Sequence, residues 1–347
     1  MRNFKLSYLH VLALLVVASG CKKEEEVPRG EYAVGVVILN EGNFTDADGT
    51  VGYYDPTSKD IQQDIYQKVN NETVSGSFQS FYTFEDRTYI IDQKGHKIIV
   101  VEAETFKYVA TINAGLNTPR YMTIANGKGY VSNWGDWVET GGLWTLPNSY
   151  IAVIDLTSFT VINTLNTSDG VEGLTTINNQ VYAAAAYSTK VHIINPANDE
   201  IVGGYDTPYG PSQFVEDGNG RLWVLCSNNL VKIDITGDRI LNTFEIAGGA
   251  RSITSNGDGS KIYYLSAPWG VPAEIYVIDN SATFAPQKAL ITGDSFYGLG
   301  VNPDDETIYV GISNPTSNGT IVRYNSDGTE LDNFASGRFP NGFEFRR

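Results

Sequence analysis

A unit of about 40 to 50 residues recurs along this chain, and it constrains the fold more than any other feature of the sequence. Two copies begin at Pro119 and Pro211. Each has a short apolar segment, a turn rich in Asn, Asp and Gly, and a second segment rich in aromatic and β-branched residues. This pattern predicts a β-hairpin. A third strand that ends in an Asp, Asn or Glu (residues 153–155) and a more polar fourth strand (residues 161–165) complete the unit. Four strands at this period are typical of a β-propeller blade.

The first strand of the unit carries an apolar anchor residue, and the anchors give the number of blades. The last anchor lies in a single strand close to the C-terminus, whereas the first unit, which starts at Val34, has no first strand of its own. We therefore expect the C-terminal strand to complete the first blade, which closes the ring and removes open sheet edges. The anchors are Phe81, Met122, Leu174, Phe214, Ile253, Leu299 and Phe343.

These features predict an all-β fold, a seven-bladed β-propeller with four-stranded blades in residues 34–347. A β-sandwich, the main alternative, explains neither the near-constant period nor the split first unit. No segment has the periodicity of an amphipathic helix. The predicted blades span residues 34–66 with 340–345, 78–113, 119–165, 171–205, 211–244, 251–290 and 296–334.

The N-terminus has the features of an export signal, which we assign to residues 1–20. Arg2 and Lys5 form a short positive region before a mostly apolar run, and small residues precede Cys21. The pattern resembles a bacterial lipoprotein signal, in which the cysteine begins the mature chain and is the site of lipidation. The alternative is an ordinary secretory signal followed by a chance cysteine. Residues 21–33 are predicted to be an acidic tether. Their Cys-Lys-Lys-Glu-Glu-Glu start resembles the export tag of Bacteroidetes surface lipoproteins, which implies a lipid-anchored protein on the outer membrane, at the cell surface.

The charge of the chain limits its partners. It has 24 Lys and Arg against 40 Asp and Glu, a formal net charge of −16. Nucleic acid and anionic lipid head groups need clustered cations, so neither is an expected partner. Anionic ligands are disfavoured for the same reason, although a local basic spot remains possible. Cys226 lies in a strand-like run, which predicts a buried structural thiol.

The residue two positions before each anchor is expected to face the propeller axis. All seven of these residues are polar or can form hydrogen bonds. Propeller axes are narrow and solvated, so polarity alone has a structural explanation. Two arginines, a glutamate and several amides around one funnel are nevertheless suited to ligand binding. The seven residues are Gln79, Arg120, Glu172, Ser212, Arg251, Tyr297 and Asn341.

Long loops on the same face carry four of the five tryptophans, Trp134, Trp137, Trp144 and Trp269. Long loops in compact domains are often functional, and exposed aromatic residues are typical of recognition surfaces. The alternative is that these tryptophans only pack their own loops. We assign the four tryptophans, together with Tyr187, to the ligand-binding face.

Signals for catalysis and metal binding are weak. The segment Asp46-Ala47-Asp48-Gly49 resembles part of a calcium loop, but the other ligands are missing, so a turn is the preferred interpretation. The chain has no histidine cluster for zinc and no nucleophile elbow. We assign no catalytic residue, no metal ligand and no cofactor, and keep calcium open as a weaker possibility.

Two phrases, ILNEGNF at residues 38–44 and GTVGYYD at residues 49–55, resemble the opening of Bacteroidetes surface lipoproteins with YncE-like propellers. Some of these are similar to BtuG-type proteins, which bind cobalamin (vitamin B12) and cap its outer-membrane transporter. The resemblance implies a protein that is not an enzyme. It implies capture of cobalamin or a related corrinoid and transfer to a TonB-dependent transporter. No binding residue carries over individually. The alternatives are a lactonase-like propeller hydrolase and a surface scaffold or glycan-binding propeller.

Overall fold

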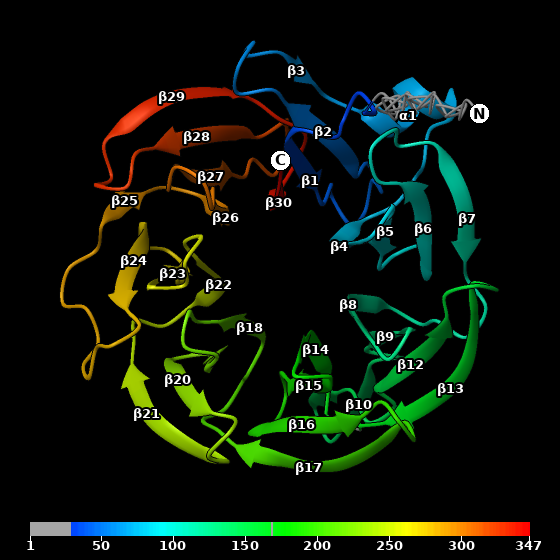
Figure 1. Cartoon of the computed structure of the whole chain (residues 1–347), viewed down its shortest axis with the longest axis vertical. Coiled ribbons are helices and arrows are strands. Elements are labelled where there is room, and N and C mark those ends of the chain that lie inside the picture. Colours follow the sequence, from blue (N-terminus) through cyan, green and yellow to red (C-terminus); the bar gives the residue numbers. More distant parts are fainter. Residues whose placement is uncertain (1–28, 168) are drawn as a thin grey trace, which may run out of the picture.

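The computed structural model describes residues 29–167 and 169–347. In these residues, seven four-stranded antiparallel sheets surround a central axis, and one two-stranded sheet is attached to them (Figure 1). The inner strands of successive blades contact one another around the axis. The prediction of an all-β, seven-bladed propeller with four-stranded blades is therefore confirmed. The assignments made for residues 1–20 and for lipidation of Cys21 concern positions outside the described residues.

The first blade combines the first strands of the propeller with the C-terminal strand, as predicted. Its strands, from the axis outwards, are β30 (Pro340–Arg346), β1 (Gly35–Asn40), β2 (Thr50–Tyr54) and β3 (Ile61–Gln62). Val36 pairs with Phe345, and Ile38 pairs with Phe343. The C-terminal strand thus supplies the innermost position that the first unit lacks, and the ring closes through backbone hydrogen bonds.

The other six blades are continuous in sequence and are wound in the same way, from the axis outwards. The second has β4 (Phe78–Phe84), β5 (Arg87–Asp92), β6 (Lys97–Glu102) and β7 (Tyr108–Ile112). The third has β8 (Pro119–Ala125), β9 (Lys128–Asn133), β12 (Tyr150–Asp155) and β13 (Thr160–Asn166). The fourth has β14 (Val171–Ile177), β15 (Gln180–Ala185), β16 (Lys190–Asn195) and β17 (Glu200–Asp206). The fifth has β18 (Gln213–Glu216), β19 (Leu222–Leu225), β20 (Asn229–Asp234) and β21 (Arg239–Glu245). The sixth has β22 (Ala250–Ser255), β23 (Lys261–Ser266), β24 (Ala273–Asp279) and β25 (Ile291–Gly293). The seventh has β26 (Phe296–Val301), β27 (Ile308–Ile312), β28 (Thr320–Tyr324) and β29 (Glu330–Ala335).

Three details differ from the sequence-based expectation. A short helix, α1 (Ile65–Asn70), follows the first blade and is capped by the Asp64 side chain. Its six residues are too few to show a helical repeat. The long loop of the third blade contains a hairpin, β10 (Val138–Thr140) and β11 (Leu143–Thr145). The sixth blade extends past residue 290, because its outer strand β25 follows a long connection after β24.

The core lies between the blades, where the middle strands face one another. Trp223 is fully buried on β19 and stacks on Phe244, while its indole nitrogen donates a hydrogen bond to Asp217 (2.9 Å). Cys226 is also fully buried, and burial raises the pKa of its thiol to about 12. The prediction that Cys226 is a buried thiol is confirmed. No helix among the described residues is long and apolar enough to cross a membrane.

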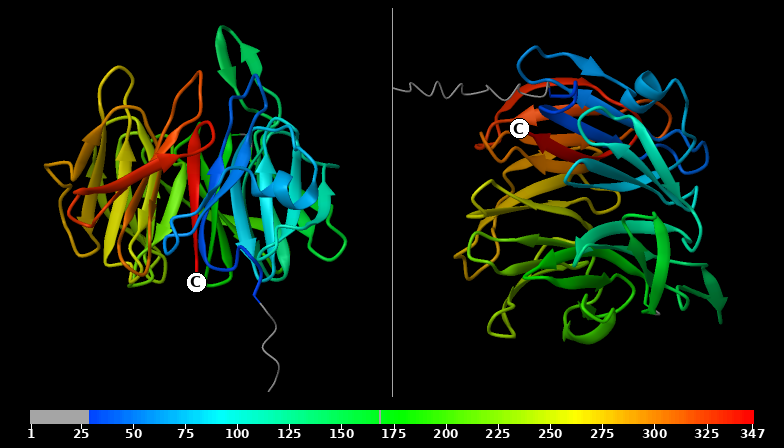
Figure 2. Two further views of the ribbon diagram at one scale, coloured as in Figure 1. Left: turned by 90° about the horizontal axis from the view of Figure 1, so that it is seen from above. Right: turned by 45° about the vertical axis from the view of Figure 1, so that its right-hand side comes forward.

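The two faces of the ring are distinct. The β10–β11 hairpin projects from one face, and the C-terminus and the first described residues lie on the opposite face (Figure 2). Arg29 donates a hydrogen bond to the backbone oxygen of Arg347 there (2.5 Å). Since β30 runs to this second face, its start and the starts of the other inner strands lie at the face of the hairpin. We call that face the mouth face.

Candidate functional site

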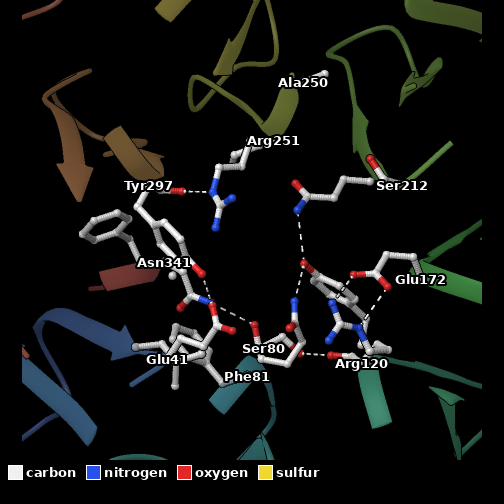
Figure 3. A pocket seen from close by; sticks show the side chains of 17 residues that line it. Glu41, Ser80, Phe81, Arg120, Glu172, Ser212, Ala250, Arg251, Tyr297 and Asn341 are labelled. Carbon is white, nitrogen blue, oxygen red and sulfur yellow. Dashed lines mark hydrogen bonds and ion pairs between the residues drawn. The ribbon is translucent and has the colours of Figure 1, made fainter. Parts of the chain in front are cut away.

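A cavity of about 450 Å³ lies on the axis, at the starts of the inner strands (Figure 3). Its volume is within the range of small-molecule sites. All seven residues that the repeat places two before each anchor line it: Gln79, Arg120, Glu172, Ser212, Arg251, Tyr297 and Asn341. Ten further residues complete the lining, among them Glu41, Tyr121 and Gln213. We call this cavity the funnel.

β-Bulges explain why residues at one repeat position reach the funnel. In every blade but the fifth, the strand pairing shifts at the start of the inner strand. Between the paired residues on either side of the shift lie single residues such as Gln79, Arg251 and Tyr297. A bulge adds a residue to one strand and redirects its side chain, and bulges are common beside binding sites. The repeat therefore supplies a ring of unpaired residues whose chemistry can vary without changing the sheets.

Three side chains from different blades meet across the axis. The hydroxyl of Tyr121, on β8, accepts hydrogen bonds from the side-chain amides of Gln79 and Gln213, each at 3.2 Å. Burial raises the pKa of Tyr121, so the hydroxyl stays neutral. The axis is filled by uncharged hydrogen-bonding groups at this level. Sequence reasoning missed Tyr121 and Gln213. The shift in the third blade spans Arg120 and Tyr121 together, which the repeat alone does not reveal.

One side of the funnel, formed by the third and fourth blades, contains a buried ion pair. Arg120 donates from Nε and Nη2 to the two carboxylate oxygens of Glu172, at 3.0 and 2.9 Å. Its Nη1 donates to Gln93, whose amide donates in turn to Glu41 (3.0 Å). Burial is the largest single effect and opposes ionisation of Arg120, but the charge and hydrogen bonds of Glu172, together with smaller effects of Tyr121 and Glu41, outweigh it and raise the pKa of Arg120. The positive charge of Arg120 is thus already neutralised by the protein.

Three predicted aromatic residues gather beside this ion pair. The Arg120 guanidinium lies over the Trp134 ring, 3.8 Å from its centroid. Trp134, Trp137 and Tyr187 contact one another edge to face, with centroids 5.3 to 6.0 Å apart. Trp137 and Tyr187 are each 41% exposed. We call these three residues the aromatic cluster; none lines the funnel itself, but Arg120 connects the cluster to it.

The opposite side of the funnel, formed by the sixth, seventh and first blades, is arranged differently. The Arg251 guanidinium lies over the Tyr297 ring, 3.5 Å from its centroid. The Tyr297 hydroxyl donates to Glu41 (2.5 Å), and burial together with the charge of Glu41 raises the pKa of Tyr297. The side-chain amide nitrogen of Asn341 donates to the backbone oxygen of Gln79 (3.1 Å). The amide oxygen of Asn341 is buried without a partner among the described residues.

The remaining predicted tryptophans lie apart from the funnel. Trp144 is on β11 of the projecting hairpin and is 62% exposed, and Trp269 is fully exposed. Neither lines the cavity. The structure therefore brings Trp134 and Trp137 together but not Trp144 and Trp269.

The segment considered for calcium is held by an arginine. Arg338 Nη1 donates to Asp46 (2.7 Å) and to Asp48 (2.8 Å), and the other Asp48 oxygen accepts from the backbone of Asn43 (2.6 Å). These contacts fit the preferred interpretation as a turn. In residues 29–167 and 169–347, no group of three or more His, Cys, Asp or Glu side chains is placed to hold a metal ion.

Solved structures with similar folds are distant in sequence. A candidate 6-phosphogluconolactonase from Bacteroides uniformis has a TM-score of 0.67 at 10% identity, covering 90% of this chain and 99% of its own. A second candidate 6-phosphogluconolactonase, from Bacteroides fragilis, has a TM-score of 0.67 at 10% identity. The match covers 92% of this chain and 99% of that protein. AztD from Citrobacter koseri has a TM-score of 0.59 at 11% identity. The match covers 89% of this chain and 96% of AztD. At these identities the likeness shows the fold alone.

No curated protein matches the chain. A family model does match, over residues 34–345, which is nearly the whole described propeller. The chain therefore belongs to the family described as "Domain of unknown function (DUF5074)".

Proposed function

We propose that this protein captures a corrinoid such as cobalamin at the mouth of the funnel. The observation that carries the proposal is the combination of hydrogen-bonding side chains in the funnel with the exposed aromatic cluster at its rim. A corrinoid has a broad macrocycle with uncharged amide arms, so it needs apolar contact and hydrogen bonds in the same place. Residues 38–55 resemble YncE-like surface lipoproteins, of which some are similar to cobalamin-binding proteins; this resemblance marks the group of proteins, and the choice of ligand rests on the site.

The size of the funnel limits how such a ligand would bind. A corrinoid is larger than a cavity of about 450 Å³. The macrocycle would lie across the mouth, and an amide arm would enter toward Gln79, Gln213 and Asn341. Trp137 and Tyr187, both partly exposed, would then contact the macrocycle from the side of the third and fourth blades.

The position of the chain ends fits capture from outside the cell. We propose that Cys21 carries a lipid that anchors the protein to the outer membrane, at the cell surface. The described chain starts at Arg29, beside Arg347, on the face opposite the mouth. A tether leaving from that face would leave the mouth unobstructed by the anchor. We further propose delivery of the corrinoid to an outer-membrane TonB-dependent transporter, which co-purification from cross-linked membranes would test.

Calorimetric titration of the purified protein with cyanocobalamin tests the capture proposal. We expect saturable binding of one molecule per chain at micromolar concentration or below. The absence of binding heat, with binding also absent by equilibrium dialysis, would contradict the proposal. Tightly bound calcium in a metal analysis would instead support the lactonase-like hydrolase that the sequence left open.

A further inference from the structure

Four charged side chains line the funnel, and three of them already have partners. Arg120 and Glu172 form an ion pair, and the carboxylate of Glu41 accepts hydrogen bonds from Gln93 and Tyr297. Arg251 is the exception. Its Nε donates to the backbone oxygen of Tyr297 (2.9 Å), and in the described part of the chain its two terminal nitrogens have no acidic partner and contact only the Tyr297 side chain.

Arg251 is nevertheless held in one place. The pairing shift between Ala250 and Ser252 places it at the start of β22, and its guanidinium points into the funnel (Figure 3). The guanidinium is fixed by the Nε hydrogen bond and by stacking on Tyr297. Tyr297 is fixed in turn by its bond to Glu41. A side chain that is already ordered loses little entropy when it binds a ligand.

The free edge of a guanidinium has a defined chemical partner. Its two terminal nitrogens donate in one plane, a geometry that matches the paired oxygens of a carboxylate or a phosphate. We propose that Arg251 binds an oxyanion group of the ligand, a phosphodiester or a carboxylate. Arg120 does not compete for this role, because Glu172 occupies two of its nitrogens.

This assignment rests on the funnel being the ligand site, as proposed above, but its first test needs no corrinoid. Dimethyl phosphate and acetate are titrated into the protein while the arginine Nε–Hε signals are followed by NMR. The signal lost in Arg251→Gln identifies Arg251. We expect a saturable shift of this signal with at least one of the two anions, and none with uncharged trimethyl phosphate. The anion that binds more tightly identifies the group. No saturable shift with either anion, or an equal shift with trimethyl phosphate, overturns the assignment.

The second test uses two corrinoids that differ in the anionic group. Cyanocobalamin has a phosphodiester in its nucleotide arm, and dicyanocobinamide lacks that arm. If the phosphodiester is the group bound, Arg251→Gln should weaken cyanocobalamin binding about 10- to 100-fold, as expected for charged hydrogen bonds, and change dicyanocobinamide binding little. Arg239→Gln, an exposed arginine on β21 outside the funnel, is the matched control.

Equal weakening of both corrinoids by Arg251→Gln would overturn the role of Arg251 in binding the phosphodiester. If the wild-type protein binds neither corrinoid, the proposed function fails. The anion titration then still decides whether Arg251 is an oxyanion site. The two proposals can therefore fail separately.

Discussion

The two sides of the funnel contain the same pair of groups, an arginine over an aromatic ring, but only one of the two arginines has an acidic partner among the described residues. On each side an arginine from the same repeat position lies over an aromatic ring, Arg120 over Trp134 and Arg251 over Tyr297. The side chain of Arg120 is 9% exposed and is paired with Glu172, whereas Arg251 is exposed and has no acidic partner among the described residues. The difference shows that the repeat fixes where a side chain points, while residues on neighbouring blades decide whether it stabilises the fold or stays free for a ligand.

The largest expected difference between the two sides is in stability. Arg120→Met leaves the Glu172 carboxylate buried without its partner, which should lower the free energy of unfolding by about 3 to 5 kcal/mol. Arg251→Met loses an exposed cation–π contact and one exposed hydrogen bond to the Tyr297 backbone but leaves no buried charge unpaired, so it should cost only about 1 to 2 kcal/mol. Urea unfolding followed by tryptophan fluorescence measures both. Equal losses would show that the two sides do not differ in this way.

A double variant separates the ion pair from its surroundings. Arg120→Met combined with Glu172→Met removes both charges, so no unpaired charge remains buried. We expect it to be more stable than Arg120→Met alone, by about 2 kcal/mol or more. If the double variant is as unstable as the single one, packing against Trp134, rather than charge, accounts for the loss.

Binding measurements on two tryptophan variants test whether the aromatic cluster takes part in ligand binding. Trp137→Ala removes an exposed member of the aromatic cluster and should weaken cyanocobalamin binding about tenfold. Trp269→Ala removes an equally large but fully exposed ring that lies outside the funnel, and should change the affinity by less than about twofold. Calorimetric titration of both variants checks this. Equal effects would remove the cluster from the proposed site.

The smallest expected effect concerns alkaline pH on the Arg251 side. Burial, together with Glu41, raises the pKa of Tyr297 above its ordinary value in the unfolded chain, near 10. The stability from this shift is fully present below pH of about 10 and is lost as the pH rises toward the folded-state pKa. The unfolding free energy of the wild type should therefore fall faster than that of Tyr297→Phe above this pH, by at most about 1.4 kcal/mol per pH unit.

Tyr209→Phe, which changes an exposed tyrosine, is the control for the alkaline measurement. Its slope above pH of about 10 should match that of the wild type. Parallel slopes for the wild type and Tyr297→Phe would contradict the expected role of Tyr297.

The sequence predicted which residues line the funnel better than it predicted the contacts between their side chains. The repeat located Arg120, Glu172 and Arg251, because one bulge position recurs in most blades. It did not reveal that Arg120 pairs with Glu172, or that Tyr121 meets Gln79 and Gln213 across the axis, because these partners come from different blades.

Local structure was harder to predict where it interrupts the repeat. The helix α1 is one short segment held by the Asp64 cap and by the buried residues Ile65 and Tyr66. The β10–β11 hairpin pairs three residues with three. Neither is long enough to produce a periodic signal, so the sequence pattern predicts neither.

The position of cobalt in crystals grown with cyanocobalamin tests the central claim most directly. Anomalous diffraction at the cobalt edge locates the metal of the ligand without reference to the protein. We expect one peak per chain over the funnel, on the mouth face and between Trp137 and Arg251. A peak at the outer strands of the blades, a peak on the face of Arg347, or no bound corrinoid would contradict it.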